Sequence, residues 1–362
     1  MHFMDIIKRN HVMTTTKSIF DVINTISHNN ELIFIIADKQ VDNKFASLVQ
    51  KLESQNIICK LEKINNELHI IIKEKAYKSS FISRSSWVPR ILFAVVTILV
   101  MIDGYYKTIE INLSIYIGNP IYIASIYTTS LLGILGTHEL GHLIIAKMHG
   151  MKTTWPYFIP GIPIFGIPTF GAFIKSRNLI TNRKILFDVA IAGPIFGLIT
   201  TIIVLIYGVS TAPILDEETI QNMFYDNQII EIKENFIMLF IFDKFKNNNE
   251  HILMTPILFA SWIGFLITFL NLLPAWQLDG GHMARSAFGS KMHKILTYSS
   301  IAFLFILGYF AMGIFIMLLY LLNPTIDILD DVSNLPLNRK ALYILVIFLI
   351  LTCFPIPHNL LF

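Results

Sequence analysis

The sequence predicts a polytopic α-helical membrane protein with about six transmembrane helices, a membrane-embedded β-hairpin or re-entrant loop, and a small N-terminal α+β domain. Of its 362 residues, 54% are hydrophobic and only 15% are charged, whereas an average soluble domain is about 25% charged. Apolar runs long enough to span a bilayer recur after residue 87. The 28 basic and 25 acidic residues nearly balance, so nothing in the charge favours nucleic-acid binding.

Residues 1–86 are expected to form a soluble domain on their own. An apolar run at 32–37 predicts a strand and the pattern at 43–54 predicts a helix. Two further strands are expected at 57–61 and 68–73, which completes a βαββ unit. Its scattered acids, lysines and histidines form no recognisable chemical arrangement, so a structural role is favoured, with regulation or partner binding as the alternative.

The rest of the chain is divided by its apolar runs. Transmembrane helices are expected over residues 88–102, 120–148, 185–209, 256–273, 296–322 and 342–355. An acidic insert at 210–251 separates the third helix from the fourth and is expected outside the cytoplasm. We therefore expect a functional transmembrane core over 87–295 and C-terminal transmembrane helices over 296–362.

Basic residues gather in alternate loops, which predicts the orientation of the chain in a cell membrane. By the positive-inside rule, both termini and the basic loops lie in the cytoplasm. The acidic insert then lies outside, together with Asp327, Asp330 and Asp331. Arg339 and Lys340 at the start of the last helix are the exception to this arrangement.

An apolar segment between the second and third helices is too rich in proline and glycine to be a regular spanning helix. Seven such residues lie within 155–174. Irregular backbone at membrane depth is tolerated where it is buried in protein or lines a cavity. We expect a re-entrant loop or hairpin against the second helix, with a short strand over 169–175.

The second helix carries a metal-site motif, His138-Glu139-Leu140-Gly141-His142. The two histidines lie one turn apart on the same helix face, so both imidazoles can reach one ion, and Glu139 lies beside them as a general base. Ionisable residues within a membrane are costly and therefore indicate function. The alternative is a polar patch buried between helices.

A hydrolytic zinc ion needs a third protein ligand, and Asp279 is the best candidate. It follows Pro274, which interrupts the helix, and precedes two glycines, so its carboxylate lies where the backbone bends. A helix N-cap is the alternative role for Asp279, and His149 or His282 could replace it as the ligand. Asp188 is expected either at the membrane surface, which we favour, or as a hydrogen-bond partner of a metal ligand.

These residues resemble the motifs of the site-2 protease family, the intramembrane zinc metalloproteases of peptidase family M50. The resemblance rests on the histidine motif and on Asn271 through Gly280, which fits the family's Asn, Pro and Leu-Asp-Gly pattern. It covers about residues 88–288 and is greatest to the archaeal and plastid branch. No stretch fits the PDZ domain that some bacterial members carry.

The resemblance implies a zinc-dependent endopeptidase that hydrolyses transmembrane segments of membrane proteins, as in regulated intramembrane proteolysis. One Zn²⁺ per chain would be held by His138, His142 and Asp279, and Glu139 would move protons. Asn271 matches the asparagine suggested to hydrogen-bond the developing oxyanion, although a hydrogen bond between two helices would also explain it.

A transmembrane substrate must be unwound before hydrolysis, so the expected strand is a candidate docking site. An extended substrate could pair with its edge by β-augmentation. The residues concerned are Thr169, Phe170, Gly171, Ala172 and Phe173. The competing interpretation is a membrane transporter, or a metal or proton pathway, that uses the same intramembrane histidine, glutamate and aspartate side chains.

Overall fold

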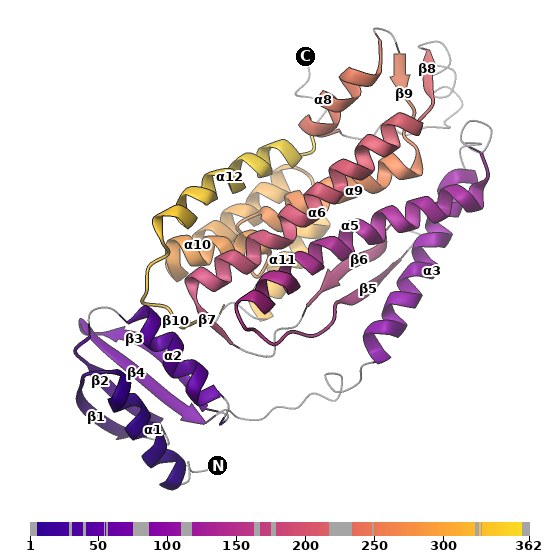
Figure 1. Ribbon diagram of the computed structural model, residues 1–362. Helices are drawn as coiled ribbons and strands as arrows, with labels where there is room; N and C mark the ends of the chain where they lie inside the picture. Colours follow the sequence, from indigo (N-terminus) through magenta and orange to yellow (C-terminus); the bar gives the residue numbers. More distant parts are fainter. Residues whose placement is uncertain are drawn as a thin grey trace.

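The protein consists of a helical body with a small α/β domain at one end (Figure 1). The computed structural model describes residues 6–28, 31–38, 41–53, 55, 57–74, 87–109, 118–162, 167–174, 179–216, 234–247, 250–322, 326 and 328–356. The α/β domain is connected to the body both through the chain and through a shared β-sheet, which determines how the functional site is held.

The N-terminal domain contains the predicted βαββ unit, preceded by a helix and a strand that the sequence analysis did not identify. Its elements are α1 (Ile6–Ile19), β1 (Val22–His28), β2 (Glu31–Ile36), α2 (Asp42–Glu53), β3 (Ile57–Ile64) and β4 (Glu67–Glu74). Asn65 and Asn66 join β3 to β4 with φ values of 49° and 70°, the left-handed conformation that tight hairpin turns require. Phe34, Leu61 and Ile70 are fully buried in the core of the domain.

Two short strands from the membrane part extend this sheet. Its order is β1-β2-β4-β3-β10-β7, where β7 is Ile180–Asn182 and β10 is Ile328–Asp330. Asp330 pairs with Leu61 of β3, and β10 runs parallel to both of its neighbours. Segments far apart in the sequence therefore meet where the small domain joins the helical body.

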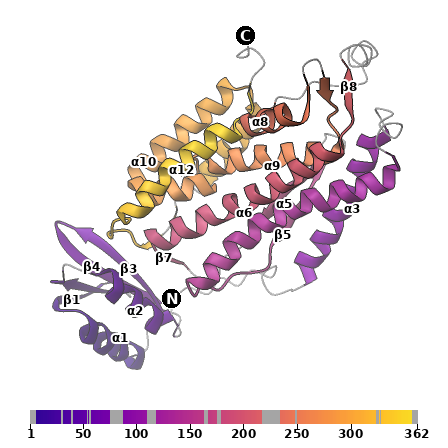
Figure 2. The same ribbon diagram turned by 45° about the horizontal axis from the view of Figure 1, so that its top comes forward.

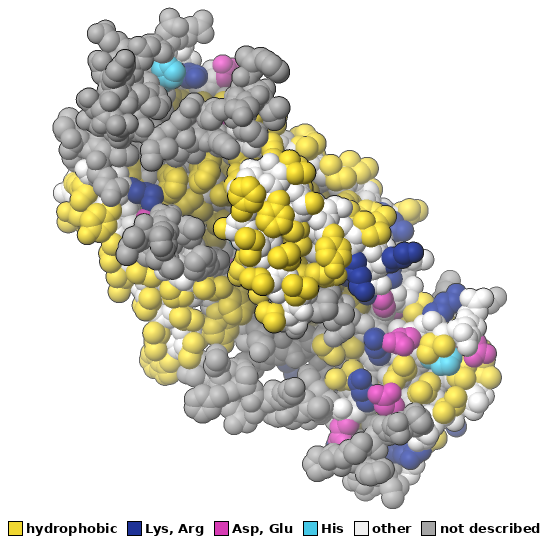
Figure 3. All heavy atoms as spheres, turned by 180° about the vertical axis from the view of Figure 1, so that it is seen from behind, with side chains coloured by type: hydrophobic (Ala, Val, Ile, Leu, Met, Phe, Trp, Pro, Cys, Tyr) yellow, Lys and Arg dark blue, Asp and Glu magenta, His cyan; other side chains and the backbone are white. Residues whose placement is uncertain are grey.

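The body is built from α3 (Trp87–Ile109), α5 (Pro120–Met148), α6 (Arg183–Thr211), α9 (Pro256–Leu272), α10 (Asp279–Ile306), α11 (Phe310–Leu322) and α12 (Leu337–Cys353). Among the described residues, α3, α5 and α6 are long and apolar enough to cross a membrane, and α9 and α11 are shorter apolar helices. The helices lie alongside one another in both ribbon views (Figure 2). Hydrophobic side chains cover most of the described surface of the body (Figure 3).

Side-chain caps define where the central helices begin. Asn119 accepts a hydrogen bond from the backbone N–H of Ile121 at 2.9 Å, and Pro120 occupies the first turn of α5. Asn182 caps α6 in the same way, and Thr255 caps α9 ahead of Pro256. Such caps satisfy backbone donors that the first helical turn leaves unpaired. The start of α5 at Pro120 confirms the prediction from the sequence.

The fifth predicted helix, 296–322, is two helices. Helix α10 spans Asp279–Ile306 with a kink at Gly289, whose φ is 81°. Helix α11 begins at Phe310, and Gly308 between α10 and α11 has a φ of 83°. This left-handed conformation suits glycine and ends a helix. Apolar composition continues across the break, so a hydropathy pattern merges the two helices.

Both chain ends were expected on one side of the membrane, which stays a prediction, but the described residues show where the last helices lead. Strand β10 lies in the sheet of the N-terminal domain, so α11 returns the chain to that end. Helix α12 then leads away from it, because Asn235 bridges to Pro355 and the Ile356 N–H donates to the Glu234 carbonyl at 2.9 Å. Asp330 and Asp331 therefore lie at the N-terminal-domain end, opposite to the expectation, while Asp327 lies outside the described residues.

The predicted hairpin is present. Strand β5 (Tyr157–Ile162) pairs antiparallel with β6 (Ile167–Phe173), and the two pack against α3, while β6 also packs against α5. The rings of Tyr157 and Phe173 stack at 5.4 Å. The acidic insert contains β8 (Ile214–Asp216), α8 (Phe236–Phe245) and β9 (Glu250–Ile252), and residues 217–233 lie outside the described part.

Candidate metal centre

Helix α5 places His138 and His142 on one face, deep in the helical body. Their Nε2 atoms lie 3.2 Å apart, and only 6% of His138 is exposed. The helix is regular through this region, so the spacing of four residues brings the two rings together as the sequence predicts.

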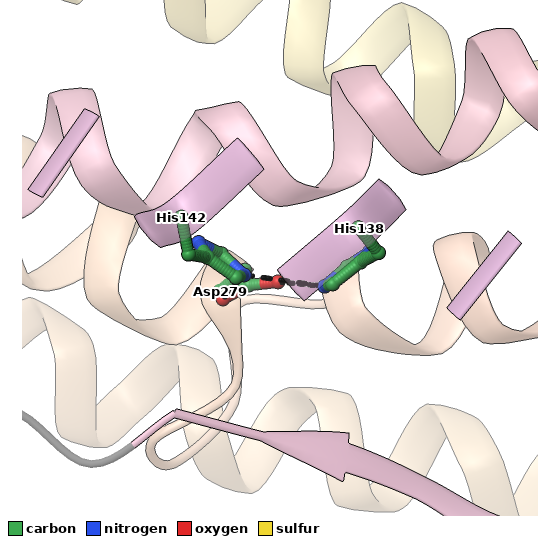
Figure 4. Close-up of side chains that lie close together, drawn as sticks. All are labelled: His138, His142 and Asp279. Carbon is green, nitrogen blue, oxygen red and sulfur yellow. Dashed lines mark hydrogen bonds and ion pairs between the residues drawn. The ribbon is translucent and has the colours of Figure 1, made fainter. Parts of the chain in front are cut away.

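The structure brings Asp279 to these histidines from the start of α10 (Figure 4). Its Oδ2 lies 3.2 Å from His138 Nε2, and its Oδ1 lies 3.4 Å from His142 Nε2. The N-cap of α10 is Leu278, which makes no side-chain cap, so the capping role considered for Asp279 is wrong. The Asp279 carboxylate is turned toward the two histidines.

Tight backbone packing between α9 and α10 positions the aspartate. A Cβ atom at Gly280 would lie 2.0 Å from the carbonyl oxygen of Leu272, and one at Gly281 would lie 2.3 Å from that of Trp276. Real Cβ contacts are never this short, so only glycine fits at either position. The paired glycines allow the turn that points Asp279 back at α5.

Helix α6 supports the histidines from the other side. His142 Nδ1 lies 2.8 Å from the carbonyl oxygen of Val189. Because a carbonyl oxygen only accepts, Nδ1 carries the proton and Nε2 keeps a free lone pair for a metal. A Cβ atom at Gly193 would lie 2.1 Å from His142 Nε2, and one at Gly197 would lie 3.1 Å from His138 Nδ1. The small residues of α6 therefore make room for the ligands.

The three donor atoms fit a zinc ion. Ligands about 2.0–2.1 Å from a tetrahedral ion are separated by about 3.3 Å. The two Nε2 atoms here are 3.2 Å apart, and each lies 3.2 or 3.4 Å from one of the two Asp279 carboxylate oxygens. Two imidazoles and one carboxylate are also ligands that zinc prefers, and three protein ligands leave one position for water. Among the described residues, these three form the group that can hold a metal ion.

The donors open onto a cavity of about 350 Å³. Glu139 lines it and is only 6% exposed, and Asn271 lines it from the end of α9. The cavity thus brings together a metal site, a carboxylate and an amide.

The hairpin residues divide into two groups. Ala172 and Phe173 of β6 line the cavity. Thr169 instead stabilises the hairpin, since its hydroxyl donates to the Ile159 carbonyl at 2.9 Å and accepts from the Gly171 N–H at 3.1 Å. Gly171 is required for its backbone, with a φ of 99°. The Phe170 side chain lies outside what the structure describes.

The two alternative ligands, His149 and His282, are not part of the three-residue group. His149 Nε2 is 3.3 Å from an Asp188 oxygen, and Asp188 also accepts hydrogen bonds from Arg339. Asp188 is therefore part of an ion-pair group with His149 and Arg339 near the helix ends. His282 lines the cavity but does not belong to the three-residue group.

Sequence reasoning did not find the roles of Val189 and Gly193. The Gly193-Pro194 pair suggests only close helix packing, and a backbone carbonyl such as that of Val189 has no sequence signal at all. The sequence contained one signal. A glycine in an apolar helix leaves room for a side chain of a neighbouring helix to pack against its Cα. Which side chain does so depends on the register between the two helices.

The fold and the site define a helical membrane protein with a buried His-His-Asp metal centre and an adjacent glutamate, which is the arrangement of a metallopeptidase. A family model described as peptidase family M50 matches residues 126–312, more than half of the chain. The chain belongs to this family, as the motif resemblance predicted.

Its relatives include plant zinc metalloproteases. The chain is 31% identical over 235 residues to the probable zinc metalloprotease EGY2, chloroplastic, of Arabidopsis thaliana, covering 62% of this chain and 40% of the relative. It is 24% identical over 301 residues to the EGY2 protein of Oryza sativa subsp. indica, covering 80% and 53% respectively. The chain thus spans about half of the length of these relatives. No solved structure gives a significant match.

Proposed function

We propose that the protein is a zinc-dependent intramembrane endopeptidase that hydrolyses peptide bonds in transmembrane segments of other membrane proteins. The observation that carries this proposal is the meeting of His138, His142 and Asp279 in one cavity with Glu139, enclosed by apolar helices. A structural metal site would close around its ion and would need neither an open cavity nor a buried carboxylate beside it.

The side chains support a hydrolytic mechanism. A bound zinc ion supplies Lewis acidity, which polarises a peptide carbonyl and makes water a better nucleophile. Glu139 takes the proton of the attacking water and then delivers it to the nitrogen of the leaving amine. The Asn271 amide, which lines the same cavity, donates to the carbonyl oxygen as negative charge develops there. Helices around the cavity limit access of water, which strengthens these interactions.

Strand β6 is the proposed docking element for the substrate. It pairs with β5 on one side, and its residues Ala172 and Phe173 border the cavity of the metal centre. A substrate segment that pairs with β6 as a further strand would present its peptide bonds to the metal site in an extended form.

We further propose that the protein crosses a cell membrane with the N-terminal domain in the cytoplasm. Lys and Arg side chains gather where the body meets this domain (Figure 3), as the positive-inside rule requires. Because α10 and α11 are separate and β10 returns to the N-terminal domain, α3, α5, α6, α9, α10, α11 and α12 make successive crossings. The last described residues then lie outside the cytoplasm.

The test is cleavage of single-span membrane substrates by the purified full-length protein in detergent or liposomes, with zinc quantified. We expect about one zinc per chain, and Glu139→Gln should keep the zinc but lose at least about 10²-fold in rate. Wild-type rates for Glu139→Gln would refute the proposed chemistry. Bound zinc without proteolysis, together with metal flux into liposomes, would favour a transporter instead.

A further inference from the structure

His282 is a third histidine, next to the two that belong to the metal centre, and its ring has an unusual environment. It lies on the first turn of α10, where its backbone N–H donates to the Leu278 carbonyl at 2.9 Å. The side chain lines the cavity that contains Glu139 and the metal ligands. Yet Nδ1 is sealed within the protein, without a hydrogen-bond partner among the described residues. Buried polar atoms are nearly always paired, so an unpaired one needs an explanation.

The sealed Nδ1 determines which nitrogen carries the proton. A neutral imidazole has one donor and one acceptor nitrogen. An unpaired acceptor costs less to bury than an unpaired donor, and a charged ring would bury a donor and a charge together. The favoured form of His282 therefore carries its proton on Nε2. Since Nδ1 is sealed, the ring edge that lines the cavity is the one that includes Nε2.

We propose that His282 is a catalytic hydrogen-bond donor, whose Nε2–H binds the carbonyl oxygen of the scissile peptide as that oxygen becomes negative during hydrolysis. The proposal rests on the proposed peptidase function and adds a residue to it. Donors aimed at a developing oxyanion in a water-poor site stabilise the transition state more than the substrate. His282 would act with Asn271, which lines the same cavity.

A purely structural histidine has different contacts, as His293 in the part of α10 after the Gly289 kink shows. It is 3% exposed, and its Nε2 hydrogen-bonds the Trp276 carbonyl at 2.8 Å. That bond ties α10 to the turn before it. His282 makes no such bond to another described residue and keeps its ring against the cavity. Its environment therefore suits a ring whose Nε2–H finds a hydrogen-bond acceptor only when substrate is bound.

The test compares His282→Gln with His282→Asn in the full-length protein. A glutamine places its amide nitrogen near the position of Nε2, whereas an asparagine places it near that of Nδ1. We expect His282→Asn to lower kcat by about 10²-fold with KM within about twofold, and His282→Gln to stay within about tenfold of wild type. Both variants should keep the zinc content and apparent melting temperature of the wild type. His149→Gln, at a histidine outside the cavity, should match the wild type in every measurement.

Equal activity of His282→Asn and His282→Gln would overturn the assignment. Loss of zinc in parallel with loss of activity would also overturn it, because His282 would then act by supporting the metal site. The outcome is separable from that of the proposed function. If Glu139→Gln is inactive while His282→Asn cleaves like wild type, only the role of His282 fails. If Glu139→Gln cleaves like wild type, the peptidase mechanism itself fails.

Discussion

Arg285 holds Asp331 with two parallel hydrogen bonds, from Nη1 to Oδ1 at 2.9 Å and from Nη2 to Oδ2 at 2.7 Å. Arg183 adds a third bond to the same carboxylate, at 3.1 Å from Nε to Oδ1. Arg285 lies on the helix that begins with Asp279, Arg183 lies at the start of α6, and Asp331 directly follows β10. One carboxylate therefore ties the sheet of the N-terminal domain to α6, which supports His142, and to α10, which carries Asp279.

Removing the Asp331 carboxylate should lower the stability of the folded protein. Asp331→Asn leaves two arginines without their counter-charge, and Arg285 has only 8% of its side chain exposed. Because Asp331 is partly exposed, we expect a loss of about 1–2 kcal/mol, seen as a fall of about 1–3 °C in apparent melting temperature. Asp243→Asn is the control, since the Asp243–Lys244 pair is exposed and should contribute almost nothing. Equal melting temperatures for both variants would contradict the assigned role.

The same carboxylate predicts a pH dependence. Burial acts to raise the pKa of Asp331, but the hydrogen bonds and charges of Arg285 and Arg183 outweigh it and hold the pKa below its ordinary value of 3.8. A lowered pKa stabilises the folded state above the unfolded pKa, and this contribution is lost as the pH falls through the folded value. The stability difference between wild type and Asp331→Asn should therefore be constant from pH 7 to about 5 and shrink below 3.8. If the stability difference between wild type and Asp331→Asn grew as the pH fell, the predicted direction of the pH dependence would be wrong.

Strand β10 should control how firmly the N-terminal domain is attached. Leu329 is buried in the core of that domain, while Ile328 packs with Leu186 and Ile180 of the membrane part, and these two line the metal cavity. Leu329→Ala removes packing between the two parts, which costs about 2–5 kcal/mol for a buried leucine.

Backbone hydrogen exchange measures this attachment. In Leu329→Ala, we expect faster exchange in β3 and β10, which pair at Leu61 and Asp330. Leu337→Ala is the matched control, because Leu337 is 83% exposed. Unchanged protection of both strands in Leu329→Ala would show that β10 does not hold the domain.

Gly193 should be required for metal binding. A methyl group there would overlap His142 Nε2, at 2.1 Å, so Gly193→Ala must displace the ligand or the helix. We expect zinc to fall well below one per chain in metal analysis of the purified protein, with activity falling in parallel. Gly133→Ala on α5 is the control, because nothing lies within 4 Å of its Cβ position. Full zinc occupancy in Gly193→Ala would contradict the described packing.

The β6 edge gives a prediction about substrate docking. Ala172→Pro removes a backbone donor from the strand, so cleavage should fall about tenfold or more while zinc content stays unchanged. Ala172→Ser keeps the N–H and should cleave close to the wild-type rate. The measurement is the cleavage rate of Ala172→Pro and of Ala172→Ser on one single-span substrate. Equal rates for the two variants would count against docking on β6.

The sequence by itself determined which residues form the candidate metal centre. His138 and His142 meet because helical periodicity places residues four apart on one face, with Glu139 next to His138 in the sequence. Asp279 was identifiable because Pro274 and two glycines mark a bend in an apolar region. The hairpin was predictable for the same reason, since proline and glycine exclude a regular helix.

Only the tertiary structure decided the arrangement of the chain around that chemistry. Three-residue strands such as β10 have no periodicity to detect, and the break at Gly308 is hidden because hydropathy is the same on both sides of it. That break reverses the chain, so Arg339 reaches Asp188 at the N-terminal-domain end. The carbonyl of Val189, the space at Gly193 and the sealed Nδ1 of His282 depend on helix register, which long-range packing sets and local sequence does not encode.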